Sequence, residues 1–172
     1  MRDPASVGSF FVCPRAAILS EATVELPDSI QNNLRNSMNK ITGSCLCGAV
    51  GFEVDDNFQQ LNICHCKQCQ RATGSAHASN LFTHPGNIRW TEGMDYVKRF
   101  DVPGRSISNA FCIECGSGLP YVSSTGKSLV VPAGTLNDAL IRIPKVRNIF
   151  WTERADWYEA ATAAEHHDGF PE

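Results

Sequence analysis

The sequence predicts a mainly β domain, and three observations support this prediction. Val50, Phe52 and Val54 alternate with small or polar neighbours, which is the two-residue period of a half-buried strand. Glycine and proline punctuate the chain beyond that strand, as at Pro85-Gly86 and Pro103-Gly104. No long amphipathic helical pattern follows residue 41. Many short strands with frequent turns favour an all-β sheet or sandwich.

The expected elements follow in chain order. After the strand around Phe52, further short strands are expected near 60–64, 78–83, 95–101, 106–111, 119–123 and 128–134. A helical turn or two is expected only at 67–73.

Three regions are expected. Residues 1–40 form an N-terminal extension, with a short helix starting at Pro27-Asp28-Ser29 and running through Asn39. Residues 41–160 form one domain, and residues 161–172 form a C-terminal tail.

Composition narrows the class of protein. The chain has 172 residues, of which 42% are hydrophobic, and its formal net charge is −3. This balance gives no reason to expect a nucleic-acid partner or an anionic membrane surface. No stretch approaches the length of a membrane-spanning helix, and no basic leader precedes the short apolar run near Phe10. Nothing in the sequence indicates an oligomeric state.

Seven of the eight cysteines lie in three tight clusters, and Cys13 stands apart. The clusters are Cys45-Leu46-Cys47, Cys64-His65-Cys66-Lys67-Gln68-Cys69 and Cys112-Ile113-Glu114-Cys115. Cysteines this close together are poorly placed for disulfides with one another, and an odd number of clustered thiols cannot all pair. We therefore expect metal binding in a reducing compartment, the cytoplasm.

Two zinc ions per chain are predicted, in sites of different character. Cys45, Cys47, Cys112 and Cys115 supply four thiolates, which fill a tetrahedral structural zinc site. The run at 64–69 supplies only three ligands.

The site with three ligands leaves one coordination position free. Cys64, Cys66 and Cys69 would hold a thiolate-rich ion, which is better suited to binding another sulfur ligand than to ionising water. The alternative is a second closed site with His65 or His77 as the fourth ligand. The spacing does not match the usual iron–sulfur runs, and the zinc-deaminase signature is absent.

The three cysteine strings, in their order, resemble the glutathione-dependent formaldehyde-activating enzyme family, which also includes centromere protein V relatives. The resemblance covers about 41–160. Its main strings are Gly43-Ser44-Cys45-Leu46-Cys47-Gly48, Cys64-His65-Cys66-Lys67-Gln68-Cys69-Gln70-Arg71 and Phe111-Cys112-Ile113-Glu114-Cys115-Gly116.

The resemblance implies a β-tent of antiparallel sheets. It also implies a structural zinc on Cys45, Cys47, Cys112 and Cys115 and a catalytic zinc on Cys64, Cys66 and Cys69. The activity it implies is a carbon–sulfur lyase that forms S-hydroxymethylglutathione from glutathione and formaldehyde.

The chain departs from the family at three positions near these motifs. His77 stands where relatives often carry an apolar residue, Asn148 stands where a histidine is common, and Ser117 replaces a threonine. Residues 1–40 have no counterpart in the family.

A substrate thiol such as glutathione also needs cations for its carboxylates. The candidates are Lys67, Arg71, Arg105 and Lys127. Arg71 is the preferred one because it directly follows the three-cysteine run. The leading hypothesis is therefore a zinc-dependent carbon–sulfur lyase that acts on a small thiol and a small aldehyde. The alternative is a non-catalytic, zinc-stabilised module that binds a protein partner.

Overall fold

The computed structural model describes residues 27, 40–105, 107–138, 140, 142 and 144–170. The helix predicted through Asn39 and the separate Cys13 lie outside the described residues.

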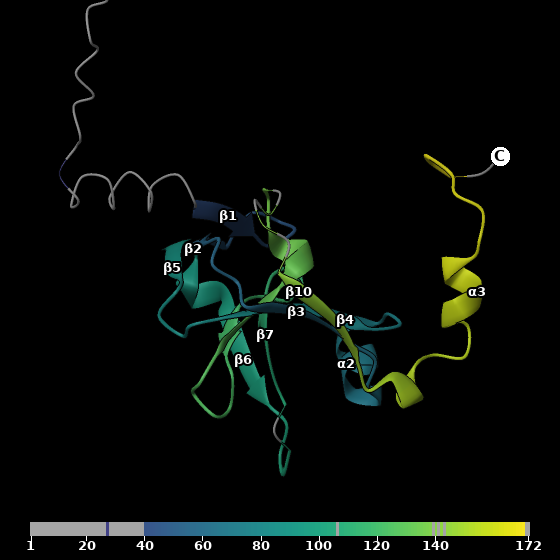
Figure 1. The fold of residues 1–172 in the computed structure, drawn as a ribbon. Helices are drawn as coiled ribbons and strands as arrows, with labels where there is room; N and C mark the ends of the chain where they lie inside the picture. Colours follow the sequence, from purple (N-terminus) through teal and green to yellow (C-terminus); the bar gives the residue numbers. More distant parts are fainter. Residues whose placement is uncertain are drawn as a thin grey trace, which may run out of the picture.

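The described chain forms three β-sheets (Figure 1). The first sheet has the order β1-β2-β5, the second has the order β10-β3-β4-β9-β8, and the third is the β6–β7 hairpin. Every strand pair is antiparallel except β10 with β3, which is parallel. The prediction of a mainly β domain with antiparallel sheets is therefore confirmed. The strands are β1 (Lys40–Ser44), β2 (Gly51–Asp55), β3 (Gln60–Cys64), β4 (Ala78–Thr83), β5 (Arg89–Glu92), β6 (Val97–Asp101), β7 (Ser108–Cys112), β8 (Tyr121–Val122), β9 (Leu129–Pro132) and β10 (Lys145–Ile149).

Most strands lie where the apolar pattern predicts them. The predicted strands at 60–64 and 78–83 coincide with β3 and β4, and four more predicted strands overlap β6, β7, β8 and β9. Three strands, β1, β5 and β10, lie outside every predicted segment. The side chains of β5 and β10 are mostly exposed, so these two strands carry no buried alternation that a sequence pattern would reveal.

The hydrophobic core draws on all three sheets. Ile41 and Phe52 from the first sheet pack with Leu81 and Val131 from the second and with Ala110 from the hairpin. Two of the clustered cysteines, Cys45 and Cys112, belong to the same buried group. The four-cysteine cluster therefore lies at the edge of the core.

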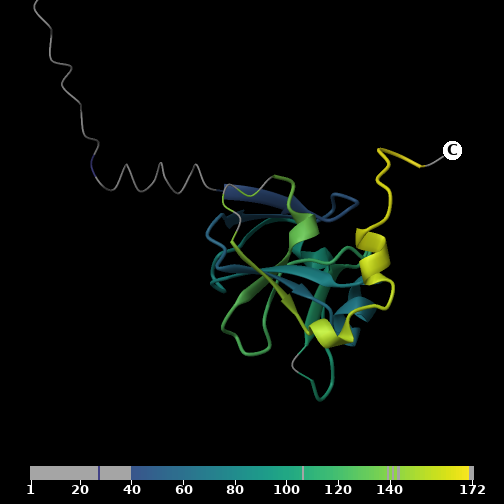
Figure 2. The ribbon, with the colours of Figure 1, turned by 45° about the vertical axis from the view of Figure 1, so that its right-hand side comes forward.

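The described part of the chain contains two short α-helices, of which α2 lies beside the five-stranded sheet (Figures 1 and 2). The first, α2 (Lys67–Thr73), confirms the predicted helical segment and ends at Gly74, whose left-handed backbone permits the turn into β4. The second, α3 (Tyr158–Thr162), was not predicted, and it spans the expected domain boundary at residue 160.

Three single 3₁₀ turns complete the described elements: η1 (Met94–Tyr96), η2 (Ala133–Thr135) and η3 (Trp151–Glu153). None of the helices in the described part of the chain has both the length and the apolar character needed to cross a membrane.

Candidate metal centres and the cavities beside them

The four-cysteine cluster joins two turns that are far apart in the sequence. Cys45 follows β1 in a turn closed by the Cys45 N–H, which donates to the Val50 carbonyl at 3.0 Å. Cys112 ends β7, and the turn after it is closed by the Gly116 N–H, which donates to the Cys112 carbonyl at 2.8 Å. The first sheet and the β6–β7 hairpin thus each present two sulfurs to one point.

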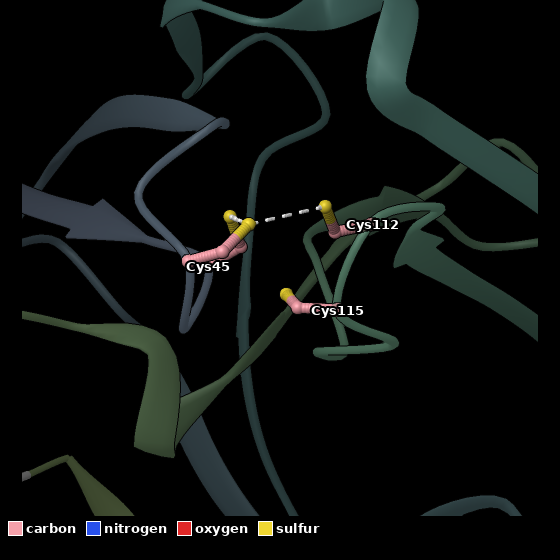
Figure 3. Close-up of side chains that lie close together, drawn as sticks. Cys45, Cys112 and Cys115 are labelled. Carbon is pink, nitrogen blue, oxygen red and sulfur yellow. Dashed lines mark hydrogen bonds between the residues drawn. The ribbon is translucent and has the colours of Figure 1, made fainter.

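The four sulfur atoms form a compact group. All lie within 4.8 Å of one another. Cys47 Sγ lies 3.4 Å from Cys45 Sγ and 3.9 Å from Cys112 Sγ. Figure 3 shows Cys45, Cys112 and Cys115 with their sulfurs turned toward a common centre. Cys45 and Cys112 are buried and Cys47 is exposed, so the cluster has one face toward solvent. This geometry can hold a tetrahedral metal ion.

Ser117 connects the two turns of this cluster. Its Oγ accepts from the Leu46 N–H at 3.0 Å and lies 3.3 Å from Cys115 Sγ. The hydrogen bond with the Ser117 side chain is the main reason that the pKa of Cys115 falls to about 6. Ser117 stands where a threonine was expected, and it still supplies a hydroxyl group. That hydroxyl joins the two turns and favours the thiolate form of Cys115.

The three-cysteine cluster is built by the start of α2. Cys64 is the last residue of β3, Cys66 is the N-cap of α2, and Cys69 lies in its first turn. The Cys66 sulfur accepts from the Cys69 N–H at 3.4 Å and lies 3.6 Å from the Cys64 sulfur. All three sulfurs lie within 4.8 Å of one another, which is the arrangement of a three-thiolate metal site.

The acidities of the three thiols differ. Burial acts to raise the pKa of Cys66, but the hydrogen bond from the Cys69 N–H and contacts with neighbouring thiols lower it overall. Burial and the Cys64 sulfur raise the pKa of Cys69.

Among the described residues, neither His65 nor His77 belongs to the three-cysteine cluster. His65 is fully buried, and its Nε2 lies 3.0 Å from the Asn148 side-chain oxygen. The ring centroids of Trp151 and Tyr158 each lie 4.9 Å from its ring. The His77 ring stands 5.5 Å from that of His65, and burial lowers its pKa. In this structure, therefore, neither histidine is placed with the three sulfurs as a fourth ligand.

The two residues expected to be unusual at their positions, Asn148 and His77, both contact His65. Asn148 hydrogen-bonds to His65, and His77 packs against His65 edge to face. His77 therefore belongs to one group of packed rings with His65, Trp151 and Tyr158, and Asn148 is the hydrogen-bond partner of His65 in that group.

Two cavities flank the three-cysteine cluster, with volumes of about 470 and 350 Å³. Volumes in this range are typical of small-molecule sites. Both are lined by Cys69, Ile107, Ser108 and Tyr121, which therefore separate them. The larger cavity is also lined by Cys64, Cys66, Gln68, Phe82, Arg105, Ser123, Ser124, Val130, Phe150 and Glu153.

Several residues of these cavities were missed by sequence reasoning. Glu153 comes from η3, and its Oε2 accepts from the Lys67 N–H at 3.0 Å, next to Cys66. Burial raises the pKa of Tyr121 to about 12, so its hydroxyl keeps its proton at neutral pH. Neither residue lies in a motif, and 86 positions separate Glu153 from Lys67. No local signal in the sequence marks them.

Of the four cations that were candidates for binding a substrate carboxylate, one lines a cavity and three do not. Arg105 lines the larger cavity. Arg71 is exposed in the last turn of α2 and lines neither cavity, although its role as the carboxylate-binding residue stays a prediction. Lys67 and Lys127 are also exposed and line neither cavity.

A family model and a curated relative name the same family. The family model described as glutathione-dependent formaldehyde-activating enzyme matches residues 40–154. A Halomonas elongata protein, provisionally named as a glutathione-dependent formaldehyde-activating enzyme, is 27% identical over 126 residues, which are 69% of this chain and 80% of that protein. A crystal structure of a Rhodobacter sphaeroides protein is 22% identical, with a TM-score of 0.49, and covers 60% of this chain and 98% of that one.

Proposed function

We propose that this chain, which belongs to the glutathione-dependent formaldehyde-activating enzyme family, is a zinc-dependent carbon–sulfur lyase that joins a thiol to a small aldehyde. Glutathione and formaldehyde are the proposed substrates, in line with the family name. The observation that carries the proposal is the three-sulfur cluster of Cys64, Cys66 and Cys69, which opens on a cavity of about 470 Å³. The cytoplasm is the proposed location, because the described cysteines are all free thiols.

The donor sets fit the two proposed zinc ions. Four thiols within 4.8 Å of one another suit a closed structural site, and three suit a site with one free position. When bound at the second site, zinc supplies a coordination position that favours the deprotonated form of an incoming thiol.

The proposed reaction needs no oxidant or reductant. A sulfur–carbon bond forms, the π bond of the aldehyde C=O breaks, and the thiol proton ends on the former carbonyl oxygen. Placing both reactants in one cavity supplies much of the acceleration, because a bimolecular encounter becomes an intramolecular one.

Two side chains of the cavity are suited to move the proton. One oxygen of Glu153 accepts from the Lys67 N–H, which leaves Oε1 to take the thiol proton. The Tyr121 hydroxyl, protonated at neutral pH, can donate to the aldehyde oxygen as negative charge develops there.

Zinc content and turnover test this proposal together. Wild type, Cys66→Ser and Cys13→Ser are compared, the last as a control from neither cluster. Zinc is measured by mass spectrometry, and adduct formation from glutathione and formaldehyde by exchange NMR. We expect two zinc ions in wild type and Cys13→Ser, but one in Cys66→Ser, with turnover reduced at least about 100-fold. A single zinc in wild type that the Cys66 change leaves in place would contradict the proposal. A chain with tightly held zinc and no turnover would instead be the non-catalytic interaction module.

A further inference from the structure

The lining of the larger cavity includes one cation that has no partner among the described residues. Among the described residues that line the two cavities, Arg105 is the only arginine or lysine. Its guanidinium makes no hydrogen bond or ion pair with any described residue. Three other arginines are paired: Arg89 with Glu53, Arg99 with Asp101 and Arg154 with Glu159.

An unpaired guanidinium beside a cavity is suited to bind an anion of the ligand. Its planar fork of N–H groups matches a carboxylate with two parallel hydrogen bonds. The surrounding lining adds hydroxyl groups, as at Ser123 and Tyr121, and apolar surface from Phe82, Ile107 and Val130. Such a mixture suits a small peptide better than a one-carbon molecule.

The size of the cavity agrees with a peptide thiol. Successive residues of an extended chain lie about 3.5 Å apart, so a cysteinyl sulfur and the carboxylate of a following glycine are separated by roughly 7 Å. A cavity of about 470 Å³ that is lined by both Arg105 and the three cysteines accommodates a span of that length.

We propose that Arg105 determines thiol specificity by holding a carboxylate of a peptide thiol while the thiol group reaches the cluster of Cys64, Cys66 and Cys69. The inference rests on the proposed function, and it moves the carboxylate-binding role from Arg71, which lines neither cavity, to Arg105. Arg105 lies in the β6–β7 hairpin connection, so the hairpin would contribute specificity while β3 and α2 contribute the sulfurs.

The test separates recognition of the carboxylate from the chemistry at sulfur. S-methylglutathione keeps both carboxylates of glutathione but has no free thiol, and its affinity for the zinc-loaded protein is measured by calorimetry. The second readout is the ratio of kcat/KM for glutathione to kcat/KM for cysteamine, a thiol with no carboxylate. The variants are Arg105→Gln, Arg105→Lys, Arg71→Gln and Lys127→Gln, and zinc content is verified in each.

We expect Arg105→Gln to weaken S-methylglutathione binding about tenfold and to lower the kcat/KM ratio about tenfold, since a charge-assisted hydrogen bond from an exposed arginine has this effect. Arg105→Lys, which keeps the charge, is expected to recover part of both losses. Lys127→Gln, a matched loss of charge outside the cavities, is expected to match wild type.

The inference would be overturned if Arg105→Gln had an S-methylglutathione affinity and a kcat/KM ratio within twofold of wild type. It would also be overturned if Arg71→Gln lowered both quantities as much as Arg105→Gln or more. In both cases a wild type that forms the glutathione adduct leaves the proposed function standing. A wild type that neither binds nor converts any thiol would overturn the proposed function, and the inference with it.

Discussion

At the scale of single residues, Gly93 shows how closely the backbone must pack beside the four-cysteine turn. Its φ is 69°, a conformation that side chains disfavour. A Cβ placed there would overlap the Ala49 carbonyl, two residues after Cys47. The connection from β5 to η1 can therefore lie against the four-cysteine turn only if this residue is glycine.

Gly93→Ala is expected to destabilise the fold by about 2–4 kcal/mol, because backbone strain and a clash with rigid main chain act together. Gly126→Ala is the matched control: its φ is also positive, at 71°, but open space surrounds the added Cβ. We expect the control to cost only about 1 kcal/mol. Urea unfolding at constant zinc measures the free energy of unfolding of both variants. Equal losses of stability in Gly93→Ala and Gly126→Ala would contradict the role of the Ala49 contact.

At the scale of elements, α2 is short, and its beginning is held by groups from outside the helix. The Cys66 sulfur accepts from the Cys69 N–H, and the Glu153 carboxylate accepts from the Lys67 N–H. The Gln70 side chain also contacts η3, because its Nε2 donates to the Glu153 backbone carbonyl at 2.9 Å. Because a seven-residue helix is marginal alone, η3 helps to set the positions of Cys66 and Cys69.

Glu153→Ala is expected to cost about 1 kcal/mol of stability by leaving a helix N–H without its acceptor. Glu153→Gln, which keeps an oxygen in place, is expected to cost about half as much. Glu165→Ala, on an exposed residue of the C-terminal segment, serves as the control and should change little. Chemical unfolding followed by circular dichroism gives the three values. If Glu153→Ala and Glu165→Ala are indistinguishable, Glu153 does not support α2.

At the scale of the whole molecule, one polar network joins the hairpin to the large sheet. Arg99 on β6 donates through Nη1 to the Val122 carbonyl on β8, and through Nε and Nη2 to Asp101. Ser108, which lines both cavities, donates to Asp101 and accepts from Arg99. The Arg99 guanidinium, followed by the Ser108 hydroxyl, lowers the pKa of Asp101 below its ordinary 3.8.

This network predicts an acid-dependent contribution to stability. The folded-state pKa of Asp101 is depressed, so its stabilising effect is complete above about pH 3.8 and is lost as pH falls through the lower folded value. Asp101→Asn should therefore melt below wild type at pH 5–7, with the difference shrinking as pH falls below 3.8. Melting curves of both proteins, recorded at matched pH, check this. A difference that stays constant or grows in acid would rule out the proposed linkage.

The sequence alone determined the parts of this protein that depend on short spacing. Cysteines one to three residues apart must lie near one another, so the three short cysteine clusters and the helical segment at 67–73 could be predicted locally. That the Cys45–Cys47 pair meets the Cys112–Cys115 pair depends on the tertiary structure. The strands β3 and β4 were also predicted from the sequence, with the bounds that the structure gives them.

The tertiary structure alone decided what surrounds the sulfurs. Strand pairing brings Glu153, Tyr121 and Arg105 to the cavity beside Cys66, from segments that no motif connects. It also packs His65 behind the cluster, with Asn148 at its Nε2 and the rings of Trp151 and Tyr158 against it. The physical reason is that contacts between distant segments depend on sheet register and on the packing of a shared core, and neither leaves a periodic trace in the local order of residues.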